Sequence, residues 1–140
     1  MIYGNKFKNK CPIDEETKNK IKNAADQSAK KINSKYLSRV KSMMKNPNHK
    51  DDDSYTKDEI DEVNFNDISI HFSWKDSFDI YFDSIKQNVY YDINEELEIW
   101  NDIAEILKND INKAISQPEF KIKKYQIVED SAAIVMIFKP

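Results

Sequence analysis

Three residues in the middle of the sequence have side chains suited to acid–base chemistry. His71 falls in a stretch where polar and apolar residues alternate, which predicts that it projects from the polar face of a β-strand. Asp79 and Tyr81 occupy the polar positions of the next such stretch, so a hairpin would bring them close to the histidine. An imidazole beside a carboxylate can transfer protons. Because no nucleophile is marked nearby, a histidine-based enzyme is kept as an alternative and no catalytic residue is predicted.

A second candidate for chemistry is the triplet Glu119-Phe120-Lys121, whose letters resemble the Glu-x-Lys step of metal-dependent nucleases. In that family the triplet is expected on a strand that precedes the second helix. Here it follows the predicted second helix. Asp83 and Lys86 do not replace it, because one residue too many separates them. A small metal-dependent nuclease is therefore also only an alternative.

The sequence argues against bound cofactors and metals. Gly4 is the only glycine, whereas phosphate-binding and dinucleotide-binding turns need glycine where the backbone approaches a ligand. The single cysteine, Cys11, excludes an intramolecular disulfide and any cysteine-based metal site. Asp51 to Asp53 resemble the start of a calcium-binding loop, but the central glycine of that loop is missing. We predict neither a cofactor nor a metal ion.

Tyrosines set among carboxylates instead predict a surface that binds another protein. Aromatic side chains supply contact area at such surfaces, and acids attract a basic partner and orient it. The surface is expected to combine the polar face of the hairpin with the segment that follows. The predicted partner-binding residues are His71, Asp79, Tyr81, Asp83, Tyr90, Tyr91, Asp92, Glu95 and Glu98. Because this surface would repel phosphates, nucleic acid is not the expected partner.

The charges are segregated along the chain, although the net charge is only −3. Residues 1–50 carry 13 basic and 4 acidic side chains, residues 51–112 carry 4 and 18, and residues 113–140 carry 5 and 3. Such segregation can steer a basic partner toward the acidic part. Alternatively, the basic N-terminal segment packs beside the acidic part and the two neutralise each other. The sequence leaves both interpretations open.

Two amphipathic helices are expected to frame the chain. Apolar residues at three- and four-residue steps predict the first helix over about 13–46, where the Asn33-Ser34 pair allows a kink. Lysines fill its other faces. The second helix is expected to begin after Asp92 or Asn94 and to end before Pro118.

Alternation with a period of two predicts the strands. The expected strands cover 63–74, 78–83, 119–128 and 132–138, with a short optional strand at 89–91. Lys75-Asp76 is the expected connection of the hairpin, and Trp74 is expected on the apolar face with Phe72. The strand at 132–138 is apolar on both faces, which predicts a central position in the sheet.

These elements predict an α+β fold, with two amphipathic helices packed on one side of a four- to five-stranded, mainly antiparallel sheet, in the order α-β-β-(β)-α-β-β. A chain of 140 residues can bury one substantial core, so we expect a single domain, 1–140. Residues 47–62 contain almost nothing to bury and predict a mobile acidic loop.

The chain also lacks the features of secreted and membrane proteins. Its first ten residues have no apolar stretch of the kind found in signal peptides, and no run approaches 18 apolar residues. We therefore expect a cytoplasmic protein without a membrane partner.

The main functional hypothesis is a non-enzymatic protein inhibitor, an immunity protein that neutralises a cognate basic toxin of the nuclease type. A phage-encoded inhibitor of a host defence nuclease, of the anti-CRISPR kind, would use the same physical features, and the sequence does not separate the two. The identity of the partner and the oligomeric state are left open. The basic helix at 13–46 is a further candidate for an interaction surface.

Overall fold

The structure is a computed structural model that describes residues 11–45, 55–85, 89, 93, 97–128 and 132–139. Its helices are α2 (Glu15–Lys45), α3 (Lys57–Glu62) and α5 (Leu97–Ala114), together with a short 3-10 helix, η1 (Pro118–Phe120). Its strands are β1 (Ile68–His71), β2 (Ser77–Phe82), β3 (Lys124–Val128) and β4 (Ala133–Ile137). The combination confirms the predicted α+β class.

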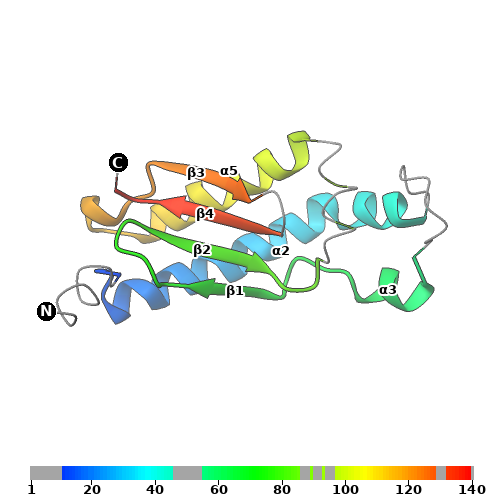
Figure 1. Ribbon diagram of the computed structural model, residues 1–140, viewed down its shortest axis with the longest axis horizontal. Coiled ribbons are helices and arrows are strands. Elements are labelled where there is room, and N and C mark those ends of the chain that lie inside the picture. The colour runs from blue at the N-terminus through cyan, green and yellow to red at the C-terminus, as the bar shows by residue number, and fades with distance from the viewer. Residues whose placement is uncertain are drawn as a thin grey trace, which may run out of the picture.

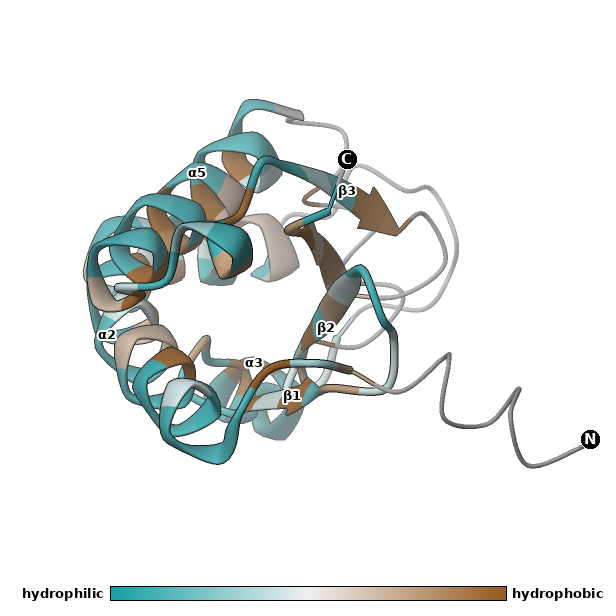
Figure 2. Cartoon of the chain, turned by 90° about the vertical axis from the view of Figure 1, so that its left-hand side faces the viewer, coloured by the Kyte–Doolittle hydropathy of each residue, from teal (hydrophilic) through white to brown (hydrophobic). Residues whose placement is uncertain are grey.

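The long helices and the sheet form two layers. Helices α2 and α5 lie side by side and cover one face of the sheet, with α2 next to β1 and α5 next to β3 (Figure 1, Figure 2). The short helix α3 lies beyond one end of the sheet, near the end of α2 (Figure 1). No described helix covers the opposite face of the sheet, which we call the outer face.

The sheet is antiparallel throughout and has the strand order β1-β2-β4-β3. Its two central strands are β2 and β4. The predicted central position of the strand at 132–138 is therefore confirmed. All five residues of β4 pair with β2 on one side and with β3 on the other, and three of the five are buried. Strands β1 and β3 form the two edges.

The core lies between the layers. Phe78, Ile80 and Phe82 of β2 point toward the helices, and each is at most 2 % exposed. From α5, Trp100 is fully buried and its ring contacts Phe82 at a centroid distance of 5.8 Å. This packing follows from the two periodicities in the sequence, two along the strand and three to four along the helix, which each gather apolar side chains on one face.

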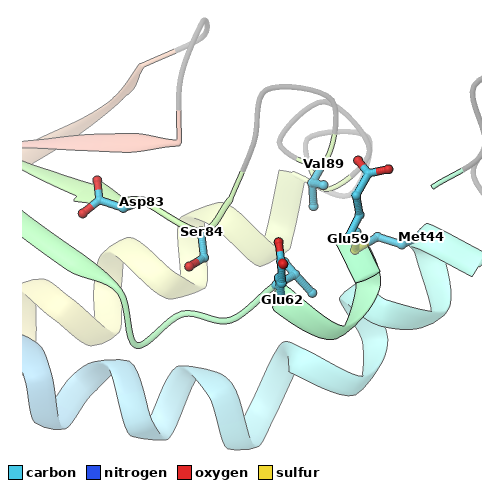
Figure 3. Close-up of a pocket in the computed structure, with 7 residues that line it drawn as sticks. Met44, Glu59, Glu62, Asp83, Ser84 and Val89 are labelled. Carbon is cyan, nitrogen blue, oxygen red and sulfur yellow. The ribbon is translucent and has the colours of Figure 1, made fainter. Parts of the chain in front are cut away.

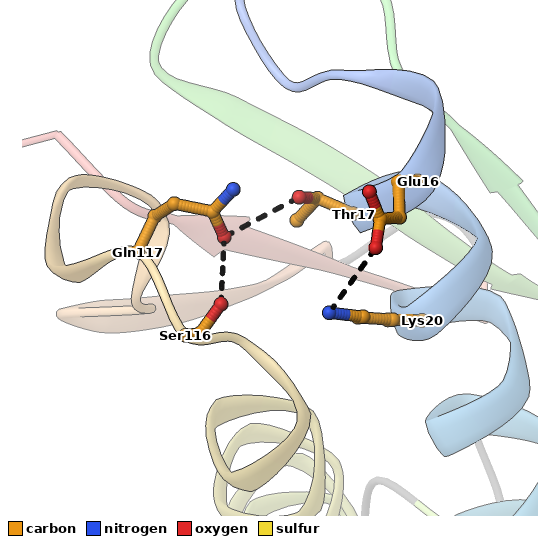
Figure 4. Close-up of polar contacts among 5 residues, drawn as sticks. All are labelled: Glu16, Thr17, Lys20, Ser116 and Gln117. Atoms are coloured by element: carbon orange, nitrogen blue, oxygen red, sulfur yellow. Dashed lines mark hydrogen bonds and ion pairs between the residues drawn. The ribbon is translucent and has the colours of Figure 1, made fainter.

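Helix α2 is continuous over 31 residues and presents one apolar stripe to the core. Glu15 and Glu16 lie in its first turn, where the helix dipole favours negative charge. In the same turn, the buried Thr17 donates a hydrogen bond to the side-chain oxygen of Gln117, in the segment that follows α5 (Figure 4). This contact fixes the start of α2 against the segment that follows α5.

Asn33 in the middle of α2 makes a second tertiary contact. Its side-chain oxygen accepts a hydrogen bond of 2.7 Å from the backbone N–H of Phe65, which is fully buried. The ring of Phe65 packs edge-on against Phe82 at 5.6 Å. Asn33 thus holds the segment before β1 against the helix, and α2 continues through Asn33-Ser34 without a break.

The predicted loop at 47–62 is wrong over its second half, because Lys57–Glu62 form helix α3. Thr56 accepts a hydrogen bond from the N–H of Glu59, and the Glu59 side chain accepts one from the N–H of Thr56. Such a capping box satisfies free donors at the start of a helix. Ile60 of α3 packs against the core, which adds an apolar contact that the loop prediction left out. Residues 47–54 lie outside the described part.

Three strand predictions also differ from the structure, the first being the strand expected at 63–74, which covers only Ile68–His71. Val89 has helical backbone, so it does not begin the optional strand at 89–91; residues 90 and 91 lie outside the described part. The strand expected from 119 begins only at Lys124, since Pro118–Phe120 form η1. The side-chain amide of Asn112 on α5 bonds both backbone groups of Ile122, and this side chain binds the segment to the helix before the strand starts.

None of the helices in the described part of the chain is both long and apolar enough to span a lipid bilayer.

Candidate functional site

The β1–β2 hairpin places the predicted polar residues on the outer face. His71 lies directly opposite Asp79, and Ser69 lies directly opposite Tyr81. Because side chains alternate along a strand, these four project away from the core that receives Phe78 and Ile80. The prediction that His71 neighbours Asp79 and Tyr81 is confirmed.

Aromatic side chains lie on this face beside Asp79. The rings of His71 and Tyr81 are tilted against each other with their centroids 4.7 Å apart. From the connection between β1 and β2, the indole N–H of Trp74 donates a hydrogen bond of 3.2 Å to Asp79 Oδ2. We refer to His71, Trp74, Asp79 and Tyr81 as the Trp74 cluster.

Trp74 is the residue that the sequence analysis misplaced. It is 53 % exposed and is the large hydrophobic residue that the described part of the chain leaves most open to solvent. The alternation of β1 was extended to it, but β1 ends at His71 and the connection covers 72–76. Phe72, just after the strand, stays half-buried against Phe78 at 5.4 Å. The polar pair Lys75-Asp76 was the available signal that the chain already turns near Trp74.

Asp83 follows β2 directly and is exposed at the end of the hairpin. Its carboxylate accepts a hydrogen bond of 3.1 Å from the Ser69 hydroxyl, and its N–H donates to the backbone oxygen of Asp67. The Ser84 hydroxyl donates a short hydrogen bond to the Asp67 carboxylate. These contacts fix two carboxylates close together where the hairpin ends.

A pocket of about 180 Å³ opens at this end of the sheet (Figure 3). Its apolar part consists of Met44, Val63 and Val89, all nearly fully buried. Glu59, Glu62, Asp83 and Ser84 complete the lining. The acidic side chains of α3 and of the hairpin therefore adjoin each other in space, although they are separated in sequence.

Not all the acidic residues are available to a partner, because two of them pair with the basic helix. Asp110 on α5 accepts hydrogen bonds from Lys31, at 3.0 Å, and from the Ser28 hydroxyl, at 2.8 Å. Asp102, about two helical turns before Asp110, pairs with Lys35 at 2.6 Å and accepts a short hydrogen bond from the Tyr36 hydroxyl. The segregated charges are thus partly neutralised between α2 and α5, as in the second of the two interpretations above.

The pairing shifts the pKa values of both carboxyl groups. Hydrogen bonds from Lys35 and then Tyr36 hold the pKa of Asp102 below its usual value, against the opposite effect of burial. Burial alone would raise the pKa of Asp110, but hydrogen bonds from Lys31 and Ser28 outweigh it and lower the pKa. Both groups are therefore members of structural ion pairs between α2 and α5.

Replacing Asp102 by asparagine is expected to destabilise the fold less in acid than at neutral pH. A carboxyl group with a lowered folded pKa contributes stability above its unfolded pKa, about 3.9, and this contribution is lost as the pH falls through the folded pKa. Asparagine keeps an oxygen for Tyr36 but carries no charge. Urea unfolding of the wild type and the variant at about pH 7 and about pH 2.5 measures the difference in their free energies of unfolding. A difference of the same size at both pH values would contradict the ion-pair assignment.

The structure does not bring all predicted partner-binding residues together. His71, Asp79, Tyr81 and Asp83 lie on the hairpin, the first three on its outer face. Glu98 is exposed in the first turn of α5 and so belongs to the helical layer. Tyr90, Tyr91, Asp92 and Glu95 lie outside the described residues.

Among the described residues, His71 is not hydrogen-bonded to a carboxylate in the way that a catalytic histidine usually is. No hydrogen bond joins His71 to Asp79 among the described residues, and one oxygen of Asp79 already accepts from Trp74. Glu119 and Lys121 do not form a nuclease-like pair on a strand: Glu119 is in η1, and the Lys121 ammonium donates to the backbone oxygen of Asn112. Within the described ranges, no group of three or more His, Cys, Asp or Glu residues is arranged to hold a metal ion.

The ion pairs found between described residues all involve α2, either within the helix or with α5. Asp79 and Asp83 take part in none of them. The hairpin thus combines carboxylates that are not neutralised by a described cation with an exposed tryptophan.

No protein-family model matches the chain, and comparison with curated proteins and with solved structures likewise gives no match.

Proposed function

We propose that this protein is a non-enzymatic inhibitor, an immunity protein that acts in the cytoplasm and neutralises a cognate basic toxin of the nuclease type. The outer face of the β1–β2 hairpin is the contact surface. The observation that carries the proposal is the Trp74 cluster, in which an exposed tryptophan, two further rings and a carboxylate share the outer face of the sheet, which no described helix covers.

Charge supports a basic partner. Residues 55–85 carry eight acidic side chains and two lysines, and this segment contains α3, the hairpin and the acidic residues that line the pocket. A surface of one sign raises the rate at which an oppositely charged partner arrives and orients its approach. An enzyme that binds nucleic acid has a positively charged cleft, which is the opposite charge that this surface would attract. Covering that cleft would block its substrate without any chemistry in the inhibitor.

Aromatic residues support tight contact once the partner has arrived. Tryptophan and tyrosine dominate the energetically important positions of protein interfaces, where they bury large areas. Both occur in the Trp74 cluster, on strands and a connection that the rest of the sheet holds in place. Strand β2 pairs on both sides, and the backbone oxygen of Asp76 accepts from the N–H groups of Phe138 and Lys139. A rigid support reduces the entropy lost on binding.

The proposal is tested by purifying the tagged protein together with the product of the adjacent gene. The expected result is a stoichiometric complex in which the nuclease activity and the cellular toxicity of the partner are abolished. A partner that does not bind, or that binds and remains fully active, would contradict the proposal. A catalytic activity of the isolated protein that disappears in His71→Ala would favour the histidine-based enzyme instead.

A further inference from the structure

Trp74 is held in place although it is exposed. Its side chain is in the connection between β1 and β2, and its indole N–H bonds to Asp79 on the neighbouring strand. An exposed indole that already has a fixed orientation offers a large ring face at little further loss of conformational entropy. The fold thus presents this ring toward solvent.

Asp79 keeps the capacity to bind a cation. The indole N–H is a neutral donor, so it does not cancel the charge of the carboxylate. It occupies Oδ2, whereas an ionised carboxylate has about four acceptor positions on its two oxygens. No ion pair with a described lysine or arginine reaches Asp79. The side chain is half-buried, which strengthens its attraction for a charged group compared with a fully solvated acid.

Rings lie on more than one side of this carboxylate. His71 is its direct neighbour across the strand pair, and Tyr81 is two residues farther along β2 on the same face. Their rings contact each other at 4.7 Å, while the Trp74 ring is tied to the carboxylate itself. A group that binds Asp79 here must therefore also lie against aromatic faces.

We infer that the Trp74 cluster binds an arginine side chain of the partner in preference to a lysine. The guanidinium group is planar, donates paired hydrogen bonds from its edge to a carboxylate, and stacks its faces on aromatic rings. An ammonium group carries the same charge but lacks the planar face and the paired donors. This inference rests on the proposed function, and it assigns the chemistry of the partner group that the surface recognises.

The test uses the protein alone with two probes of equal charge, a hexa-arginine and a hexa-lysine peptide. The indole ¹⁵N–H NMR signal of Trp74 reports binding, and that of the fully buried Trp100 serves as an internal reference. We expect hexa-arginine to shift the Trp74 signal with a dissociation constant about tenfold lower than that of hexa-lysine. Equal dissociation constants, or no shift with either peptide, would overturn the inference.

Variants assign the preference to the cluster. Trp74→Leu and Asp79→Asn are each expected to reduce the tenfold preference to about twofold or less, as measured by peptide fluorescence anisotropy. Asp76→Asn is the matched control, because it removes the same charge from the adjoining connection and leaves the hydrogen bond between Trp74 and Asp79 in place. This variant should weaken the binding of both peptides equally and leave the tenfold preference for hexa-arginine unchanged. An arginine preference that survives in Trp74→Leu would refute the assignment, and circular dichroism checks that each variant is folded.

The outcomes separate this inference from the proposed function. A partner that is bound and inhibited by the protein, combined with equal binding of the two peptides, would refute arginine selectivity and leave the inhibitor function intact. Arginine selectivity without binding of the adjacent gene product would refute the immunity function and leave the recognition chemistry in place.

Discussion

Lysine in place of both Asp79 and Asp83 is expected to lower the association rate constant with the partner by about tenfold or more at low salt. The two substitutions change the charge of the hairpin by four units, at acids that no described cation neutralises. A basic partner would then be repelled on approach. Stopped-flow measurements at low and high ionic strength give the rates, and the salt dependence should become weaker or reverse its sign.

The matched control is a second double variant, Asp26→Lys with Glu119→Lys. Both side chains are exposed and the net charge changes equally, but Asp26 is on α2 and Glu119 is in η1. This control should slow association much less than the hairpin variant. If both variants slow association equally, the net charge of the protein directs encounter and the hairpin surface does not.

Alanine in place of Asn33 is expected to lower the free energy of unfolding by about 1–3 kcal/mol. The substitution leaves the N–H of the fully buried Phe65 without the acceptor that it has now. A buried donor without a partner keeps the cost of its desolvation and regains nothing. Urea unfolding followed by circular dichroism measures the loss.

Asn23→Ala provides the control for helix propensity, because Asn23 is an exposed residue of the same helix. Alanine is the better helix former, so this variant should be neutral or slightly more stable than the wild type. A loss of stability of the same size in both variants would show that the contact with Phe65 contributes nothing specific.

The parts of the fold that could be predicted from sequence are those in which periodicity and burial agree. Ile80 and Asp79 are neighbours in sequence, yet the first is buried and the second faces outward, as period-two alternation predicts. The apolar run from 132 to 138 correctly indicated a central strand, since strands on both sides shelter its side chains from solvent. The same alternation placed His71 on the face of Asp79 and Tyr81, but it did not determine which of the two lies directly opposite His71.

The parts that could not be predicted depend on tertiary contacts or on a strand end. Asn33 suggested a kink, whereas its side chain accepts a hydrogen bond from a residue 32 positions away, which no local pattern reveals. The capping pair Thr56 and Glu59 was visible in the sequence and could have indicated α3. Trp74 was misplaced because alternation does not mark where a strand stops. Sequence periodicity therefore assigned to the core side a member of the candidate site that is 53 % exposed.

The strand order has a consequence for when the hairpin surface becomes usable. Strand β4 joins β2 to β3, yet it is the last of the four strands to be synthesised. Until residues 133–137 have left the ribosome, β2 has one open edge, β3 has no partner strand, and the connection at Asp76 lacks its hydrogen bonds from Phe138 and Lys139. The outer face is thus complete only after β4 has been synthesised and has paired with β2 and β3. A chain arrested before Ala133 would carry every residue of the Trp74 cluster without the sheet that presents it.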